Sequence, residues 1–440
     1  MVKKEFAKYV SQNILAMIGI SCYILADTFF ISISQGSDGL TALNLVLPVY
    51  SLIFAIGSMI GTGSATRFSI LRARGEAEAK LYFSNALIWE IIFGLVFTVL
   101  GILCPDGIVR LLGGDEHITA IGADYTKLFL LFGPAFTVNY TLTAFVRNDG
   151  APAKAMAATL SSSLSNVALD YLFMFPFGMG MSGAALATGI SPLISCAVCF
   201  THFFSKKNTI KFIPALPSFK RLFRSCQLGV AAFVAEISSG VTVSVFNYLM
   251  LGLEGNMGVA AYGVTANFAM VASSVFNGIA NGSQPLISHA YGSADSKESY
   301  GTMSALLKLC VGTAAVIAVV FIAAVYAFSD VFVGIFNSEG SAELAKLGTQ
   351  GMKLYFLGFL PAGLNIVLTG FLSATERAAA ASAAAILRGF AAIIAFAFLL
   401  SALFGVTGLW LAFTATELVA LIISLTAVIR FMRKGRITQN

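Results

Sequence analysis

Charged residues are scarce in this sequence. Only 11% of the 440 residues are Asp, Glu, Lys or Arg, whereas 58% are hydrophobic, and a soluble domain is about a quarter charged. So few charges cannot cover a surface exposed to water. No polar block of the size of a soluble domain interrupts the apolar runs between Asn13 and Arg430. The composition therefore excludes a soluble protein and predicts a single polytopic membrane protein.

Motifs that supply chemistry are also missing. The sequence has no GxxxxGK[ST] loop, which argues against energy from bound ATP, and no HExxH, GxSxG or histidine cluster. The six cysteines lie mostly in apolar runs, and the pair Cys196 and Cys199 is typical of small buried hydrophobes. We expect no enzyme activity, no cofactor, no nucleic-acid partner and no metal site beyond a coupling Na⁺.

Twelve apolar stretches are long enough to cross a bilayer, which takes about 20 helical residues. The first follows a basic N-terminus and has no cleavage pattern of small residues, so we predict a retained helix and not a signal peptide. Five prolines fall within helices and allow bends there: Pro48, Pro134, Pro192, Pro285 and Pro361. The predicted helices are 12–34, 42–68, 83–104, 124–146, 153–175, 181–204, 226–252, 257–289, 304–328, 346–373, 378–402 and 405–429.

The basic residues fix a predicted orientation. If both termini lie in the cytoplasm, all but five of the 27 Lys and Arg residues fall on the cytoplasmic side. The five exceptions are Arg110, Lys127, Lys346, Lys353 and Arg388. This bias also supports an even number of helices, because one miscounted helix would scatter the charges over both sides.

The two halves of the chain resemble each other. Gly180-Met-Ser-Gly is echoed by Gly405-Val-Thr-Gly, and Pro134 by Pro361. We predict an N-lobe at 1–204 (helices 1–6), a basic cytoplasmic linker at 205–225 and a C-lobe at 226–440 (helices 7–12) with a basic C-terminal tail. Six is an even number, so both all-α six-helix bundles cross the membrane in the same direction, related by a pseudo-two-fold axis along the membrane normal. Such repeats favour a transporter with alternating access.

Three segments resemble the multidrug and toxic compound extrusion (MATE) family, in its DinF-like or MepA-like bacterial branch. They are Gly-Ser-Gln-Pro-Leu-Ile-Ser-His-Ala-Tyr-Gly at 282–292, Ser-Gly-Ala-Ala-Leu-Ala-Thr at 182–188 and Ala-Asp-Thr-Phe-Phe-Ile at 26–31. The resemblance covers essentially the whole chain. It implies a V-shaped pair of six-helix lobes that exports organic, often cationic, compounds in exchange for Na⁺ or H⁺.

Two acids are predicted at one depth in the N-lobe. Asp27 and Asp170 lie roughly 8 to 11 Å below the outer surface, counted at 1.5 Å per residue. Tyr23 is one helical turn before Asp27, Asn166 is one turn before Asp170, and Thr188 falls at a similar depth. These oxygens suit a small hard cation, or else the two carboxyl groups hold a proton in the low dielectric. A purely structural role in bonding neighbouring helices is the alternative.

The resemblance adds detail at single residues. The DinF-like branch has an acidic residue in helix 1, an Asn-x-x-x-Asp in helix 5 and an Ala-x-x-x-Thr in helix 6. These imply a cation or proton site at Asp27, Asn166, Asp170, Ala184 (through its carbonyl) and Thr188. The NorM-like branch has a C-lobe site with an acidic residue in helix 10, but residues 361–369 hold no carboxylate here. Coupling is therefore expected in the N-lobe.

Four further candidates, Glu90, Glu236, Arg388 and Glu417, fall well inside predicted helices, and a charge near the bilayer centre costs at least ~2.5 to 3.5 kcal/mol. Glu236, near the midplane of the C-lobe, attracts a cationic cargo or takes up a proton, or else only bonds a neighbouring helix. Arg388 and Glu417 are expected to neutralise each other. Glu90 is expected close enough to the inner face to reach water.

The sequence thus predicts a monomeric multi-pass antiporter of the bacterial inner membrane that exports organic cations and confers antibiotic resistance. A lipid-linked oligosaccharide flippase of the same superfamily and an intramembrane lipid-modifying enzyme are the alternatives. The flippases typically have more helices and a strongly cationic cavity, whereas the intramembrane ionisable residues here are mainly acidic.

Overall fold

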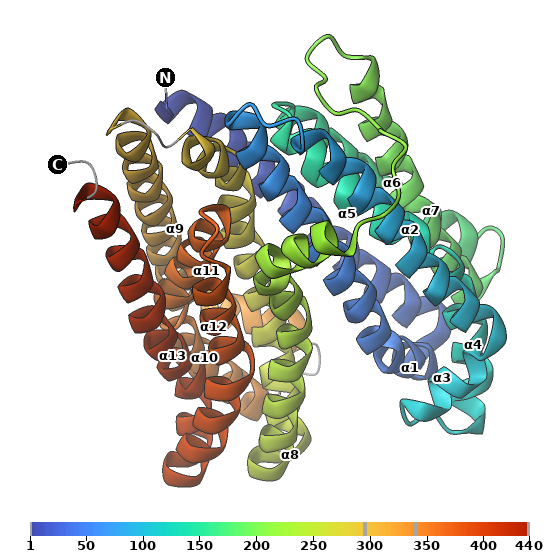
Figure 1. Cartoon of the computed structure of the whole chain (residues 1–440). Coiled ribbons are helices and arrows are strands. Elements are labelled where there is room, and N and C mark those ends of the chain that lie inside the picture. Colours follow the sequence, from blue (N-terminus) through green and yellow to red (C-terminus); the bar gives the residue numbers. More distant parts are fainter. Residues whose placement is uncertain (1, 294–296, 338–340, 438–440) are drawn as a thin grey trace. The chain divides into compact units, whose positions relative to one another are not determined.

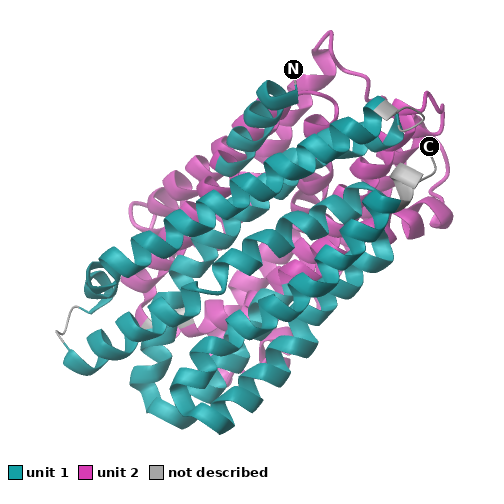
Figure 2. Ribbon diagram, turned by 90° about the vertical axis from the view of Figure 1, so that its left-hand side faces the viewer, with its two compact units in different colours: residues 1–14, 237–440 teal, residues 15–236 magenta. Residues whose placement is uncertain are grey.

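The computed structural model describes residues 2–293, 297–337 and 341–437, and these contain helices and no strand. The chain divides into two compact units, coloured separately in Figure 2. Unit 2 is residues 15–236, and unit 1 is residues 1–14 with 237–440. The predicted linker at 205–225 falls within unit 2. The boundaries of 1–204, 205–225 and 226–440 stay a prediction.

Unit 2 begins within α1 (Val2–Ala73) and ends within α8 (Phe219–Gly292). Between them lie α2 (Ala79–Leu103), α3 (Pro105–Leu111), α4 (Glu116–Leu131), α5 (Gly133–Asn148), α6 (Pro152–Met174), α7 (Gly180–Phe200) and η1 (Thr201–Phe204) (Figure 1). The rest of α8 opens the main part of unit 1. It is followed by α9 (Lys297–Phe336), α10 (Ala342–Phe356), α11 (Phe359–Ala374), α12 (Ala378–Ile386), the π-helical turn η2 (Leu387–Ala391) and α13 (Ala392–Ile437).

The longest helices are pairs of membrane passes joined by a sharp turn. At 1.5 Å per residue the 74 residues of α8 would measure about 110 Å, several times the ~30 Å of hydrocarbon. Gly255 interrupts α8 with φ 61° and ψ −152°, a conformation open to glycine alone. The rings of Phe246 and Tyr262 then stack with centroids 4.9 Å apart. Residues so distant in sequence meet only when the helix folds back on itself.

The same turn recurs at equivalent places in both units. Each instance is a Gly-x-x-Gly whose first glycine has a positive φ: Gly36, Gly180, Gly255 and Gly405. The second glycine lets the two helices meet. A Cβ on Gly258 would lie 3.0 Å from the carbonyl oxygen of Met250, and one on Gly408 only 1.9 Å from that of Leu400. The sequence echo between Gly180 and Gly405 is therefore a repeated turn.

Seven helices among the described residues are long and apolar enough to span a membrane, or nine when two bent helix pairs are each taken as one span. The bent pairs are α4 with α5 (46°) and α10 with α11 (43°). The turns at Gly255 and Gly405 each divide one of these long spans into two, which adds two spans. Helix α6, with 23 residues, adds one more and brings the described residues to twelve spans. The protein is thus an all-α membrane protein of two six-helix bundles, as predicted.

Several local expectations need correction. The predicted helices 124–146 and 346–373 are each broken in two, beside Pro134 and Pro361, because a proline lacks the backbone N–H and crowds the preceding turn, which bends or breaks a helix. The short helix α3 was not expected. In the basic C-terminal tail, residues 438–440 lie outside the described residues.

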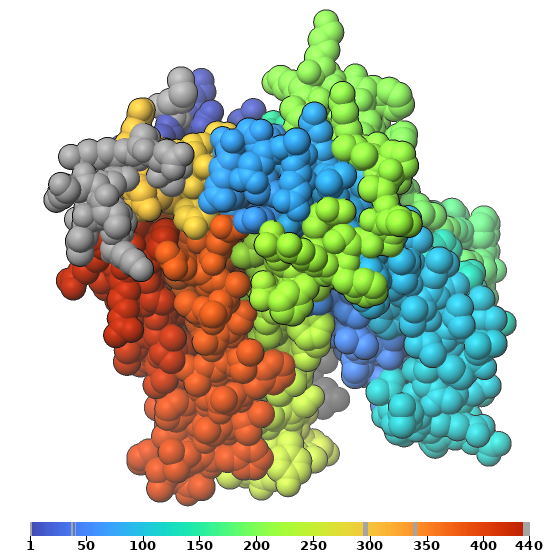
Figure 3. All heavy atoms as spheres, in the orientation of Figure 1, coloured from blue at the N-terminus to red at the C-terminus, as the bar shows by residue number. Residues whose placement is uncertain are grey.

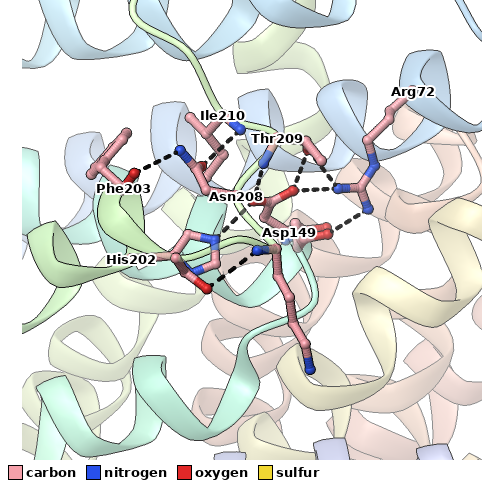
Figure 4. A network of polar contacts seen from close by, with 10 residues as sticks. Arg72, Asp149, His202, Phe203, Asn208, Thr209 and Ile210 are labelled. Atoms are coloured by element: carbon pink, nitrogen blue, oxygen red, sulfur yellow. Dashed lines mark hydrogen bonds and ion pairs between the residues drawn. The ribbon is translucent and has the colours of Figure 1, made fainter.

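Buried polar side chains hold the segment between α7 and α8 against the rest of unit 2. Asp149 accepts hydrogen bonds from Arg72 Nη1 (2.5 Å), His202 Nε2 (2.8 Å) and the backbone N–H of Thr209 (2.8 Å), and it also bonds the Thr209 hydroxyl (Figure 4). Further along, the Ile213 N–H donates to Ser84 Oγ at 2.7 Å. In the space-filling view this green segment lies against the blue surface at the start of α2 (Figure 3).

Candidate functional site

The predicted coupling residues of unit 2 come from three helices. Tyr23 and Asp27 lie on α1, Asn166 and Asp170 on α6, and Thr188 on α7. Small residues let α6 and α7 pack closely: Ala158 and Ala187 are fully buried, as is Ala184 one turn before Thr188. The structure therefore places polar side chains inside a helix pair that is otherwise apolar.

Asn166 and Thr188 are in direct contact. Asn166 Nδ2 donates to Thr188 Oγ1 at 3.4 Å, and the two residues are 1% and 6% exposed. This bond orients the amide so that its oxygen points elsewhere, and Asn166 Oδ1 is buried without a hydrogen-bond partner among the described residues. The polar pair predicted from spacing and depth is thus in contact through the Asn166 amide nitrogen and the Thr188 hydroxyl.

Asp170, one turn after Asn166, is fully buried, and neither of its carboxyl oxygens has a partner in the described part of the chain. Asp27 is partly buried and its Oδ1 is also unpartnered there. The two carboxyl groups are close enough for their charges to interact. Buried polar groups in proteins are nearly always bonded, so such unpartnered oxygens indicate a binding site for a proton or a cation.

Tyr23 joins this group, since it lies within electrostatic range of Asp27, Asp170 and Glu236. Glu236 lies directly at the division between the two units. The sequence placed it in the C-lobe, whereas it is the last residue of unit 2. The physical reason is that the first part of α8 packs on α1. A Cβ on Gly229 would lie 1.9 Å from the Met59 carbonyl oxygen, and Ser64 Oγ donates to Ser225 Oγ at 2.8 Å.

Two tyrosines near Asp27 were missed by the sequence analysis. The hydroxyl groups of Tyr50 and Tyr125 are hydrogen-bonded to each other, and both rings lie within electrostatic range of Asp27. Tyr50 also stacks on Phe129 with centroids 3.6 Å apart. A tyrosine inside an apolar run is a signal in itself, because its buried hydroxyl group needs a hydrogen-bond partner. Nothing in the sequence spacing, however, indicated that Tyr50 and Tyr125 are partners.

The buried carboxylate of Glu417 in unit 1 differs from that of Asp170 because neighbouring side chains donate hydrogen bonds to it. Glu417, 2% exposed, accepts hydrogen bonds from Arg388 Nη2 (2.5 Å), Arg388 Nε (3.0 Å) and Asn365 Nδ2 (2.7 Å). The predicted neutralisation of Glu417 by Arg388 is therefore confirmed. This carboxylate already holds an internal cation, so it offers no free oxygen to another one.

Glu90 is the clearest correction. The sequence analysis placed it near the inner face in reach of water, but it is 0% exposed. It stands eleven residues after the start of α2 at Ala79, about 17 Å into the helix and hence near its middle.

The donor set fits a proton or Na⁺ better than a transition metal. No group of three or more His, Cys, Asp or Glu residues that could hold a metal occurs in the described ranges. The oxygens of Asp27, Asn166, Asp170 and Thr188 are hard ligands, which suit hard cations.

Comparisons with known proteins agree with this architecture. The model of the MatE family matches residues 13–172 and 232–399. The multidrug export protein MepA of Staphylococcus aureus (strain NCTC 8325 / PS 47) is 30% identical over 404 residues, which cover 91% of this chain and 87% of MepA. MepA of Staphylococcus saprophyticus is 28% identical over 403 residues, with the same two coverages.

Solved structures share the fold. One is a multidrug resistance MATE family transporter of the MOP superfamily in an outward-facing conformation, with a TM-score of 0.91 and 20% identity. Another is a MOP superfamily transporter from Pyrococcus furiosus, with a TM-score of 0.90 and 19% identity. Each match covers 99% of this chain and 97% of the other. The chain belongs to the multidrug and toxic compound extrusion (MATE) family.

Proposed function

We propose that the protein is an antiporter that exports organic, often cationic, compounds in exchange for H⁺ or Na⁺. The relatives at about 30% identity are named multidrug export proteins, which supports this class of cargo. The observation that carries the coupling is the state of the buried acids. Asp170 has two unpartnered oxygens in unit 2, whereas Glu417 in unit 1 is already paired with Arg388.

The coupling step follows from electrostatics. A carboxylate in a medium of low dielectric is costly unless a proton or a cation accompanies it. Asp170 and Asp27, assisted by Asn166 and Thr188, bind the coupling ion in one state and lose it in another. If each state is open to a different side of the membrane, the ion gradient drives alternating access and the cargo leaves against its own gradient.

We place the protein in the bacterial inner membrane with both termini in the cytoplasm, on the basis of the basic residues near the predicted cytoplasmic ends of the helices. In sealed inverted vesicles the cytoplasmic face of the membrane is on the outside. A protease added to the suspension should therefore cleave a short tag at either terminus. A tag that the protease leaves intact in these vesicles would place its terminus on the periplasmic side and contradict the proposed orientation.

A flux assay tests the function. The purified full chain is reconstituted into liposomes, and the movement of a fluorescent organic cation is followed after a pH gradient or a Na⁺ gradient is imposed separately, without ATP. We expect uphill movement with one gradient and none when a protonophore or a Na⁺ ionophore dissipates it. Movement that ignores both gradients would reject ion coupling, and turnover of the liposome lipids would favour the lipid-modifying enzyme.

A further inference from the structure

Unit 2 contains a buried acid that the proposed coupling site does not use. Glu90 lies near the middle of α2 and is 0% exposed. Its partners come from α5: Thr141 Oγ1 donates to Glu90 Oε1 at 3.2 Å, and Thr137 Oγ1 donates to the Glu90 backbone carbonyl at 2.8 Å. The second carboxyl oxygen, Oε2, is buried and has no partner among the described residues.

This bonding pattern is poor for a structural carboxylate. Glu417 in unit 1 shows what a buried structural carboxylate requires, namely a guanidinium and an amide that together engage both oxygens. Glu90 has a single hydroxyl donor, and none of the ion pairs found in the described ranges includes it. A fully buried carboxyl group without a cation beside it is stable only with its proton on. Its Oε2–H then has no acceptor to hold it in place.

The surroundings of Glu90 lead toward the coupling site. The titratable groups within electrostatic range of its carboxyl are the phenol of Tyr140 on α5 and the thiol of Cys226 on α8. Tyr140 is also in range of Tyr23 and Glu236. It packs tightly on α1, where a Cβ on Gly57 would lie 3.0 Å from its ring. Tyr140 therefore lies within electrostatic range of Glu90 and also of Tyr23 and Glu236.

We propose that Glu90 is a second proton-binding site of unit 2, which gives up its proton in another state of the transport cycle and takes up a new one at the end. The proton passes from the Glu90 carboxyl to the ionised carboxylate of Glu236. The inference rests on the proposed ion-coupled export, and it specifies that at least part of the coupling is by H⁺.

The test compares Glu90→Gln with the wild type. Gln keeps the size of the side chain and an acceptor for Thr141, but it cannot release a proton. In proteoliposomes we expect export driven by a pH gradient to fall by at least about tenfold, while binding of the fluorescent organic cation stays within about twofold. Infrared difference spectra of the full-length wild type across a pH series should show the C=O stretching bands of protonated carboxyl groups, and Glu90→Gln should lose one component of them while those of Asp27, Asp170 and Glu236 remain.

A matched control separates positioning from protonation. Thr141→Val removes the hydroxyl that donates to the carboxyl and leaves the acid in place, so pH-driven export should persist with a displaced pH profile. Should Glu90→Gln fail to fold, Glu90→Asp keeps an acid that is one methylene shorter. We expect it to transport with a displaced pH profile, whereas a wild-type profile would contradict the proposal.

The outcomes distinguish this inference from the proposed function. If the wild type shows no gradient-driven export, the antiporter assignment fails. If the wild type exports and Glu90→Gln exports equally well with an unchanged pH profile, only the role of Glu90 is overturned. Identical infrared carboxyl bands in the wild type and in Glu90→Gln would likewise overturn only the role of Glu90.

Discussion

The guanidinium of Arg388 donates to the Glu417 carboxylate at 2.5 Å from Nη2 and 3.0 Å from Nε. The arginine lies in the π-helical turn η2 and the glutamate in α13, and Asn365 of α11 completes the group with a bond of 2.7 Å. Three elements of unit 1 thus share one satisfied ion pair. Since removing one partner leaves the other as an uncompensated buried charge, this group makes a sharp test of where coupling occurs.

Arg388→Ala should destabilise the protein by about 3 to 5 kcal/mol, because it leaves a buried carboxylate without its cation. The double variant Arg388→Met with Glu417→Leu should regain most of this loss. Thermal unfolding in detergent measures both. An Arg388→Ala protein as stable as the wild type would mean that the pair contributes nothing.

Asn365→Ala removes one donor of the same group and should cost about 1 to 3 kcal/mol of stability. The number of ions exchanged per cargo molecule should stay the same, because the acids proposed to couple transport lie in unit 2. Flux measurements in liposomes under known gradients give this ratio. Loss of coupling in Asn365→Ala would place the coupling site in unit 1.

Asp170→Asn should abolish the resistance that the protein confers on a drug-sensitive host, with membrane expression intact. The amide is nearly isosteric but cannot release a proton or balance a cation. Asp124→Asn is the matched control, since Asp124 is an exposed acid on α4 of the same unit. Full resistance in Asp170→Asn would reject the proposed site, whatever the control shows.

The sequence predicted contacts where helical spacing or charge gave a direct rule. Asn166, Asp170 and Thr188 were placed together by counting turns and depth, and the 3.4 Å bond between Asn166 and Thr188 confirms their proximity. Arg388 and Glu417 were paired because two isolated opposite charges in a bilayer need each other. The coupling role of the first group is untested by the structure and stays a proposal.

The errors came from helix ends and from tertiary packing. Glu90 was misplaced because its helix was predicted to begin at residue 83 and begins at Ala79, and because no pattern showed that α5 covers it. Sequence order also did not reveal that the start of α8, which leads to Glu236, packs on α1. The turns at Gly36 and Gly255 could have been found, since they repeat the Gly-x-x-Gly seen at Gly180 and Gly405.

Gly255→Ala should destabilise unit 1 by about 1 to 2 kcal/mol, because alanine is strained at a φ of 61°. Gly240→Ala is the matched control on the same helix. It has no atom within 4 Å of the added Cβ and no positive φ, so the change should be neutral or slightly stabilising. Thermal unfolding of both variants in one detergent makes the comparison. Equal melting temperatures would contradict the role assigned to the turn.

Asp149→Asn should loosen the segment between α7 and α8. The buried carboxylate fastens Arg72, His202 and Thr209, and replacing it by an amide should cost about 3 kcal/mol. We expect faster tryptic cleavage after Lys211, which becomes accessible when the backbone at Thr209 is released. Glu76→Gln is the control, because Glu76 is exposed and its nearest basic group, Arg74, is 3.9 Å away. Unchanged cleavage in Asp149→Asn would show that the bonds to Ser84 and Asn85 hold the segment without it.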